Sequence, residues 1–310
     1  MKKFFFCAAA AIVALASCSK TQVVYNDAPQ EIGFKAVTGA ITKAPIEGTE
    51  LPKTSSMVVY ASKSDAEAGT YTEYFSNAVF SWKTSYWGGT TSKYWPESGY
   101  LKFIAYYPSS IASNDDSGVE GNATTTIVIE NVDATDQTDI LYTHLTNAQA
   151  CARKPEVPMT FFHALAQVQV TAKVSDANMT DVNVTNVVLT TPILKGNLTL
   201  TGAGATWSSQ TNGTDITMNN VIGEVDLDTD AKTLGTGALV VPGTASSSLV
   251  VTYTIGGLEV TTAPISITDT WEKGKKYIYN LTIGLDEIKL SPSVSDWEDA
   301  DSENRTPNTI

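Results

Sequence analysis

The 310-residue chain contains very little cysteine or histidine. Its cysteines are Cys7, Cys18 and Cys151, and its histidines are His144 and His163. No Cys-x-x-Cys pair occurs, and the spacing of these residues fits no zinc motif. We therefore expect no metal site and no cofactor, and a Cys/His nucleophile pair finds no support either. A hydrogen-bonded core residue is the expected role of His163, which stands between apolar residues.

Positive charge is also scarce. Arg153 and Arg305 are the two arginines, and the formal net charge is −13 at pH 7. Nucleic-acid phosphates and anionic lipid surfaces bind basic side chains, so this balance argues against either as a partner. The shortage of arginine removes the side chain most used to recognise phosphate.

The N-terminal apolar run is too short to cross a membrane. Lys2 and Lys3 precede about 13 apolar residues, whereas a spanning helix needs roughly 20. The run ends in Leu15–Cys18 (LASC), which matches a bacterial lipobox, in which the cysteine is acylated, for example with palmitate. We therefore expect residues 1–18 to be a lipoprotein signal peptide and Cys18 to hold the exported chain on a membrane. An ordinary cleaved signal peptide is the alternative.

Short stretches of alternating apolar and polar residues are typical of β-strands. Residues 168–174 and 276–283 alternate in this way, and Gly256-Gly257 separates two such stretches as a two-residue hairpin turn would. Further candidate strands are 57–61, 78–82, 100–108, 124–132, 197–202, 237–243 and 264–268. Since no segment sustains a helical period, the chain is predicted to be all-β.

Residues 148–158 contain two prolines and indicate a connection between two halves of the chain. We expect a tether and a first strand at 19–43, an N-terminal β-sandwich at 44–155 and a C-terminal β-sandwich at 156–310. Each half then has an ordinary domain size.

Aromatic residues concentrate between positions 82 and 107. Trp82, Trp87 and Trp95 could form a glycan-binding platform, because flat rings stack on sugar faces. The favoured alternative is that these rings fill the core of the first sandwich.

Several segments, taken together and in this order, resemble the fimbrillin family of lipoprotein pilins. They are the lipobox, residues 94–108 (YWPESGYLKFIAYYP), residues 158–170 (PMTFFHALAQVQV) and residues 271–297. The resemblance implies two transthyretin-like β-sandwich domains in tandem and no enzymatic activity. It also implies a structural subunit of a type V pilus, located at the outer membrane and then in the fimbria, with a role in cell adhesion. The implied partners are other pilin subunits and a host or bacterial surface ligand.

In proteins of this kind a protease removes the N-terminal segment with its first strand, and a strand of the next subunit fills the groove. By this resemblance Glu31–Val37 is the removable strand and Lys43 the candidate cleavage site. The donor strand would offer Ile288, Leu290, Val294 and Trp297. Such a head-to-tail contact does not close on itself, so it builds a filament.

Lysine at position 43 differs from the arginine that polymerising members typically carry there. No arginine precedes Arg153, so either a lysine-tolerant protease acts or the segment stays. In the second case the protein is an anchor or tip subunit. A glycan-binding surface lipoprotein is a further alternative, and an enzyme is the least supported because no paired carboxylates stand out.

Overall fold

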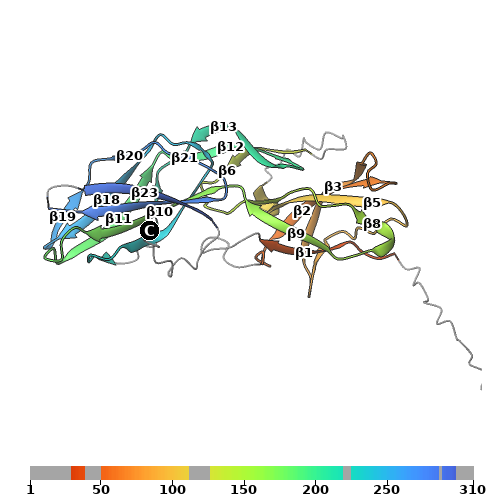
Figure 1. Ribbon diagram of the computed structural model, residues 1–310, viewed down its shortest axis with the longest axis horizontal. Helices are drawn as coiled ribbons and strands as arrows, with labels where there is room; N and C mark the ends of the chain where they lie inside the picture. Colours follow the sequence, from red (N-terminus) through yellow and green to blue (C-terminus); the bar gives the residue numbers. More distant parts are fainter. Residues whose placement is uncertain (1–28, 39–49, 112–125, 219–224, 286–287, 298–310) are drawn as a thin grey trace, which may run out of the picture.

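The computed structural model describes residues 29–38, 50–111, 126–218, 225–285 and 288–297, whose regular structure is almost entirely β-strand (Figure 1). Two short 3-10 turns, η1 (Ser109–Ile111) and η2 (Cys151–Arg153), complete the regular structure of these ranges. Among the described residues no helix has the length and apolar character needed to span a membrane. The prediction of an all-β chain is confirmed.

Eight strands form the first sheet, in the order β2-β3-β4-β1-β9-β7-β5-β8. Their bounds are β1 (Gly33–Thr38), β2 (Ser56–Ser64), β3 (Thr72–Trp82), β4 (Trp87–Gly89), β5 (Tyr100–Tyr107), β7 (Leu141–Thr143), β8 (Gln149–Ala150) and β9 (Val157–His163). A further pairing between β2 and β5 closes the path into a ring. Closure matters because the members of a closed ring have a partner on each side and leave no free strand edge.

The first core lies inside this ring. In this core the aromatic side chain of Phe34 packs edge to face against those of Phe80 and Phe103, with centroid distances of 4.9 Å and 5.1 Å. Edge-to-face contacts at this separation are the favoured geometry for aromatic pairs. The core therefore depends on β1, which precedes the rest of the sheet in sequence.

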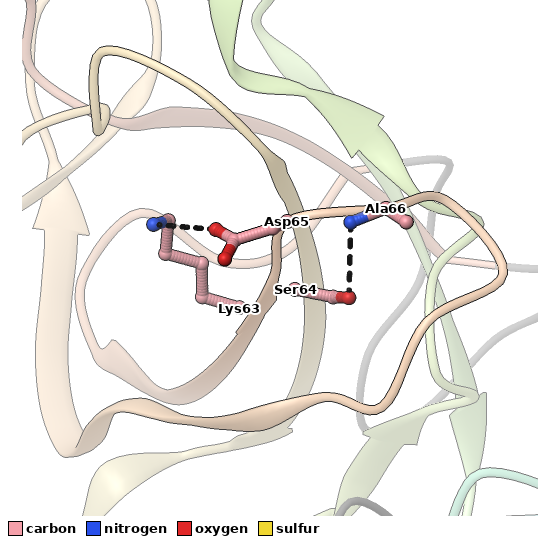
Figure 2. Close-up of polar contacts among 4 residues, drawn as sticks. All are labelled: Lys63, Ser64, Asp65 and Ala66. Atoms are coloured by element: carbon pink, nitrogen blue, oxygen red, sulfur yellow. Dashed lines mark hydrogen bonds and ion pairs between the residues drawn. The ribbon is translucent and has the colours of Figure 1, made fainter.

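A polar turn follows β2 (Figure 2). Ser64 Oγ accepts a hydrogen bond from the Ala66 amide at 3.3 Å, and Lys63 Nζ lies 3.4 Å from Asp65 Oδ1. A serine that bonds the backbone two residues ahead favours a turn over a continued strand. The contact ends β2 and reverses the chain toward β3.

The remaining strands form three further main groups. One sheet has the order β16-β10-β22-β23. Another is built around β11, which together with β14, β15, β18, β19 and β20 forms a sheet of six strands. The remaining sheet has the order β13-β12-β6, and β17 and β21 form a small separate pair. The bounds are β6 (Ile127–Asp133), β10 (Ala166–Val174), β11 (Val182–Thr190), β12 (Ile193–Thr201), β13 (Gly204–Asn212), β14 (Ile216–Thr217), β15 (Val225–Asp226), β16 (Lys232–Val240), β17 (Gly243–Thr244), β18 (Ser247–Ile255), β19 (Leu258–Thr261), β20 (Ile265–Ile267), β21 (Thr270–Trp271), β22 (Lys275–Ile283) and β23 (Ile288–Asp296).

The molecule is elongated, with the first sheet at one end, the β10 and β11 sheets at the other, and β6, β12 and β13 between them (Figure 1). A cluster of buried residues from both halves fills this junction. Gln137 adds a polar contact there, because its amide nitrogen donates to Leu239 O at 3.1 Å and its amide oxygen accepts from Leu239 N at 2.7 Å. The two ends are thereby joined by packing as well as by chain.

The chain passes from the first sheet to the β16-β10-β22-β23 sheet at Ala164–Leu165, between β9 and β10. The sequence had placed the division between residues 155 and 156, which would separate β9 from the sheet that contains it. Residues 127–133 also cross the expected division, since β6 pairs with β12. Proline content near residue 155 marks a loop, but strand pairing decides which sheet the following segment joins.

Each stretch predicted as a strand overlaps a strand of the structure, and the Gly256-Gly257 hairpin is confirmed. Both glycines have positive φ, 54° and 81°, as a turn of the primed type requires. Sequence analysis did not identify β11 or β13.

Candidate functional site

The strand expected to be removable is present as β1 and lies inside the closed ring of the first sheet. It pairs antiparallel with β4 and parallel with β9, where Phe34 faces Val157 and Thr38 faces Phe161 in the register. Figure 1 shows β1 and β9 side by side although they are far apart in sequence. Both edges of β1 are therefore occupied.

Side chains of β1 alternate between the core and the surface. Ile32, Phe34 and Ala36 are 0%, 0% and 8% exposed, whereas Lys35 and Val37 point outward. Lys35 forms an ion pair with Glu156 at 2.8 Å, with both side chains about half exposed. Since exposed ion pairs contribute little, apolar burial and the two backbone ladders hold the strand.

Backbone contacts continue ahead of β1. Ile32 N donates to Lys93 O at 2.7 Å, and Trp95 N donates to Gln30 O at 2.9 Å. On the other side, Gln30 Nε2 donates to Lys154 O at 3.0 Å. The first described residues are thus tied to two different loops of the first sheet.

Two of the predicted site residues, Cys18 and Lys43, lie outside the described residues. Lys43 falls in residues 39–49, which follow β1 directly. Lipidation and cleavage at these positions remain predictions.

The donor-strand candidates lie on β23 and just after it. Ile288, Leu290 and Val294 share one side of β23, and all nine residues of the strand pair with β22. Ile288 and Leu290 are half-buried, and Val294 is 56% exposed. Trp297 differs from them, because it is only 1% exposed and belongs to the junction cluster.

His163 is a core residue, as the sequence indicated. Its Nδ1 lies 2.8 Å from Asp139 Oδ2, and both side chains are buried. Its ring stacks on Trp297, with centroids 3.9 Å apart and planes 9° apart. Sequence analysis missed this grouping because Asp139, His163 and Trp297 come from separate segments. The one indication in the sequence was His163 itself, a polar residue between apolar ones.

The three tryptophans considered for glycan binding belong to the first core or cover it. Trp87 and Trp95 are 1% and 5% exposed, so they present no open ring face. Trp82 is half-buried, packs against Trp87, and has Lys53 Nζ 4.3 Å above its ring. As they lie, these rings match the alternative that they fill the core.

In the part of the chain that the structure describes, no three histidine, cysteine, aspartate or glutamate side chains gather as a metal site would require. Cys151 is fully buried, and burial raises the pKa of its thiol above the ordinary value. A buried thiol of this kind is a poor nucleophile. Among the described residues, the feature that best fits a functional role is therefore the position of β1 inside the closed ring.

A family model described as fimbrillin-like matches residues 21–297. The chain therefore belongs to the fimbrillin-like family, which makes it a fimbrial protein of the cell surface. A protein named as a candidate fimbrium subunit, Fim1C of Bacteroides uniformis, is 24% identical over 324 aligned positions and is covered over 99% of both chains.

Solved structures share the fold. A fimbrial protein from Bacteroides vulgatus matches with a TM-score of 0.56 at 18% identity, covering 86% of this chain and 99% of that one. A candidate cell adhesion protein from Bacteroides ovatus matches with a TM-score of 0.51 at 17% identity, covering 88% of this chain and all of that one. At these identities the likeness concerns the all-β architecture.

Proposed function

We propose that this protein is a structural subunit of a fimbria that assembles head to tail by strand exchange. In this proposal the chain is exported as a lipoprotein acylated at Cys18 and carries two transthyretin-like β-sandwich domains in tandem. A protease then cuts after Lys43 and releases β1, and a strand of the next subunit takes its place. The observation that carries the proposal is the position of β1 in the closed ring.

Removal of β1 would open the ring and create two edges, one on β4 and one on β9. Backbone N–H and C=O groups on these two edges would lose their partners. Phe80 and Phe103 would lose their edge-to-face contacts with Phe34. Unpaired edges and exposed apolar surface favour the addition of an extended strand. An incoming strand would need small or apolar side chains at every second position, because Ile32, Phe34 and Ala36 set that spacing.

The C-terminal strand β23 supplies that pattern. Ile288, Leu290 and Val294 stand on one side of it, and Ser291 and Ser293 stand on the other. Apolar residues on one side match a groove that is buried on one side only. The partner in this proposal is another fimbrial subunit, either a second copy of this chain or a related one.

Intact mass and N-terminal sequence of the protein taken from the cell surface test the maturation step. A chain that begins at Ala44 and carries no lipid supports release of β1. If every copy keeps an acylated Cys18, release does not occur, and the role of an uncleaved anchor subunit replaces the proposal.

Substitutions test the exchange itself. Lys43→Ala should abolish both the new terminus and the high-mass polymer, whereas Lys53→Ala, a nearby surface lysine, should leave both intact. Leu290→Asp should abolish polymer without blocking cleavage, because a charge on the apolar side would be desolvated in the groove. Ser291→Asp on the opposite side is its matched control. Normal polymer from Leu290→Asp would exclude β23 as the donor.

A further inference from the structure

The last strand that the structure describes, β23, is attached to its sheet with little apolar burial. Seven of the nine residues of β23 are exposed, and the other two are half-buried. Its neighbour β22 buries Tyr277, Tyr279, Leu281 and Ile283. As the end strand in the order β16-β10-β22-β23, β23 has a described partner on one side only. Backbone hydrogen bonds to β22 are thus its main attachment along its length.

The side-chain contacts of β23 with β22 are also weak ones. Lys275 and Asp296 form an ion pair between side chains that are 35% and 60% exposed. Asn280 Nδ2 donates to Ser291 O at 2.9 Å near the strand's middle. Exposed pairs of this kind contribute little to stability. A strand held in this way opens more easily than the ladder between β10 and β22, which is buried on both strands.

Trp297 is the exception at the end of the strand. Its side chain is 1% exposed in the junction cluster, and its amide donates to Gly274 O at 3.0 Å. It is the one fully buried side chain in residues 288–297. The position of β23 therefore depends on where this single ring lies.

The surface that receives Trp297 is built from the end of β9 in the first sheet and from segments next to β10 and β22. His163 ends β9, lies parallel to the indole, and is oriented by its 2.8 Å contact with Asp139. The corner after His163 is fixed by two backbone bonds, from Ala164 N to Ile140 O and from Gly274 N to Leu165 O, both 2.8 Å. None of these contacts uses a residue of β23.

We propose that Trp297 is a latch for β23 and that the His163–Asp139 pair is its seat. While the indole lies on His163, β23 stays on β22. When the indole leaves, the strand separates as a unit and the rest of the fold stays intact. Departure also brings the indole N–H and His163 Nε2, which have no hydrogen-bond partner among the described residues, into contact with water.

The meaning for assembly rests on the proposed function. If β23 is the strand offered to the next subunit, the latch decides when Ile288, Leu290 and Val294 become available. Opening of the latch itself is a property of the single chain and does not require cleavage or polymer.

Hydrogen exchange of backbone amides, measured on the uncleaved full-length chain, tests the latch. Removal of a large buried aromatic side chain is among the most destabilising substitutions, so Trp297→Ala should speed exchange in β23 by about 100-fold or more. Amides of β2, β5, β11 and β18 should keep wild-type rates. Ser295→Ala, which changes an exposed side chain of the same strand that has no part in the proposed donor side, is the control and should leave the exchange rates unchanged.

Two outcomes overturn the proposal: wild-type rates in β23 of Trp297→Ala, or one common increase over the whole chain. If Trp297→Ala does not fold, Trp297→Phe and the wild type decide. Trp297→Phe keeps an aromatic ring and should give an intermediate rate in β23. In the wild type β23 should already exchange faster than the β10–β22 ladder, and equal protection of both would contradict a separable strand.

Asp139→Asn tests the seat. Loss of the charge that orients His163 should speed exchange in β23 by about tenfold, a typical effect of weakening one buried hydrogen bond to a charged group. Unchanged rates in β23 would remove Asp139 from the seat. The two proposals can fail separately. If Trp297→Ala speeds exchange in β23 as expected but the wild-type protein forms no polymer on cells, the latch stands and only the proposed function is overturned.

Discussion

Phe34 on β1 and Phe103 on β5 meet edge to face, with ring centroids 5.1 Å apart and planes 83° apart. The contact joins the first described strand to β5, which closes the ring of the first sheet by pairing with β2. It makes the N-terminal strand part of the core rather than an appendage. In the proposed strand exchange, loss of β1 would remove Phe34 from this contact and leave Phe103 without it.

Phe34→Ala should lower the free energy of unfolding by about 3–5 kcal/mol, because the ring is fully buried and its neighbours cannot close the cavity completely. Urea unfolding of the full-length chain measures the change. Lys35→Ala, on the outer side of the same strand, should stay within about 0.5 kcal/mol of the wild type. A loss below about 1 kcal/mol for Phe34→Ala would mean that β1 is not part of the first core.

Acrylamide should quench only a minor part of the tryptophan fluorescence of the folded chain. Four of the six tryptophans are at most 5% exposed, and Trp82 and Trp207 are half-buried. Trp82→Phe should remove part of the quenchable signal, whereas Trp87→Phe should remove only shielded signal. Strong quenching of Trp87 would show an open ring face and would revive the glycan-binding alternative.

Cys151 should not react with a thiol reagent at pH 8 while the chain is folded. The side chain is fully buried, and burial raises the pKa of the thiol, so the reactive thiolate is both scarce and inaccessible. Denaturant should release the thiol. The measurement is a colorimetric thiol titration on a Cys7→Ser, Cys18→Ser chain, and rapid reaction before denaturation would contradict the buried position.

Gln137→Ala should destabilise the chain by about 1–3 kcal/mol, since the amide side chain makes reciprocal hydrogen bonds with the Leu239 backbone at the junction. Loss of the side chain leaves the backbone N–H and C=O of Leu239 without these two hydrogen bonds. Gln149→Ala is the matched control, because its amide bonds only the carbonyl of Asn147 on the surface. Equal unfolding curves for the two variants would show that the junction does not depend on Gln137.

Local pattern was sufficient to locate most strands and the two-residue hairpin, since side-chain alternation and glycine conformations act over a few residues. It was insufficient for β9, which follows a proline-containing loop yet joins the first sheet through β1 and β7. It also gave no indication that Trp297 lies on His163. Pairings between distant segments depend on the packing of the whole chain, and no short window contains them.

The sequence by itself determined that the chain is all-β, and the order of its motifs placed it with fimbrial proteins. Alternation with a period of two leaves one apolar side on each strand, and only sheets bury such strands together. The tertiary structure alone decided that β1 lies between β4 and β9 with both edges occupied, and that the indole following the exposed strand β23 is buried on His163. Both features depend on contacts between residues far apart in the chain. These contacts stabilise the protein only once the closed ring and the junction have formed.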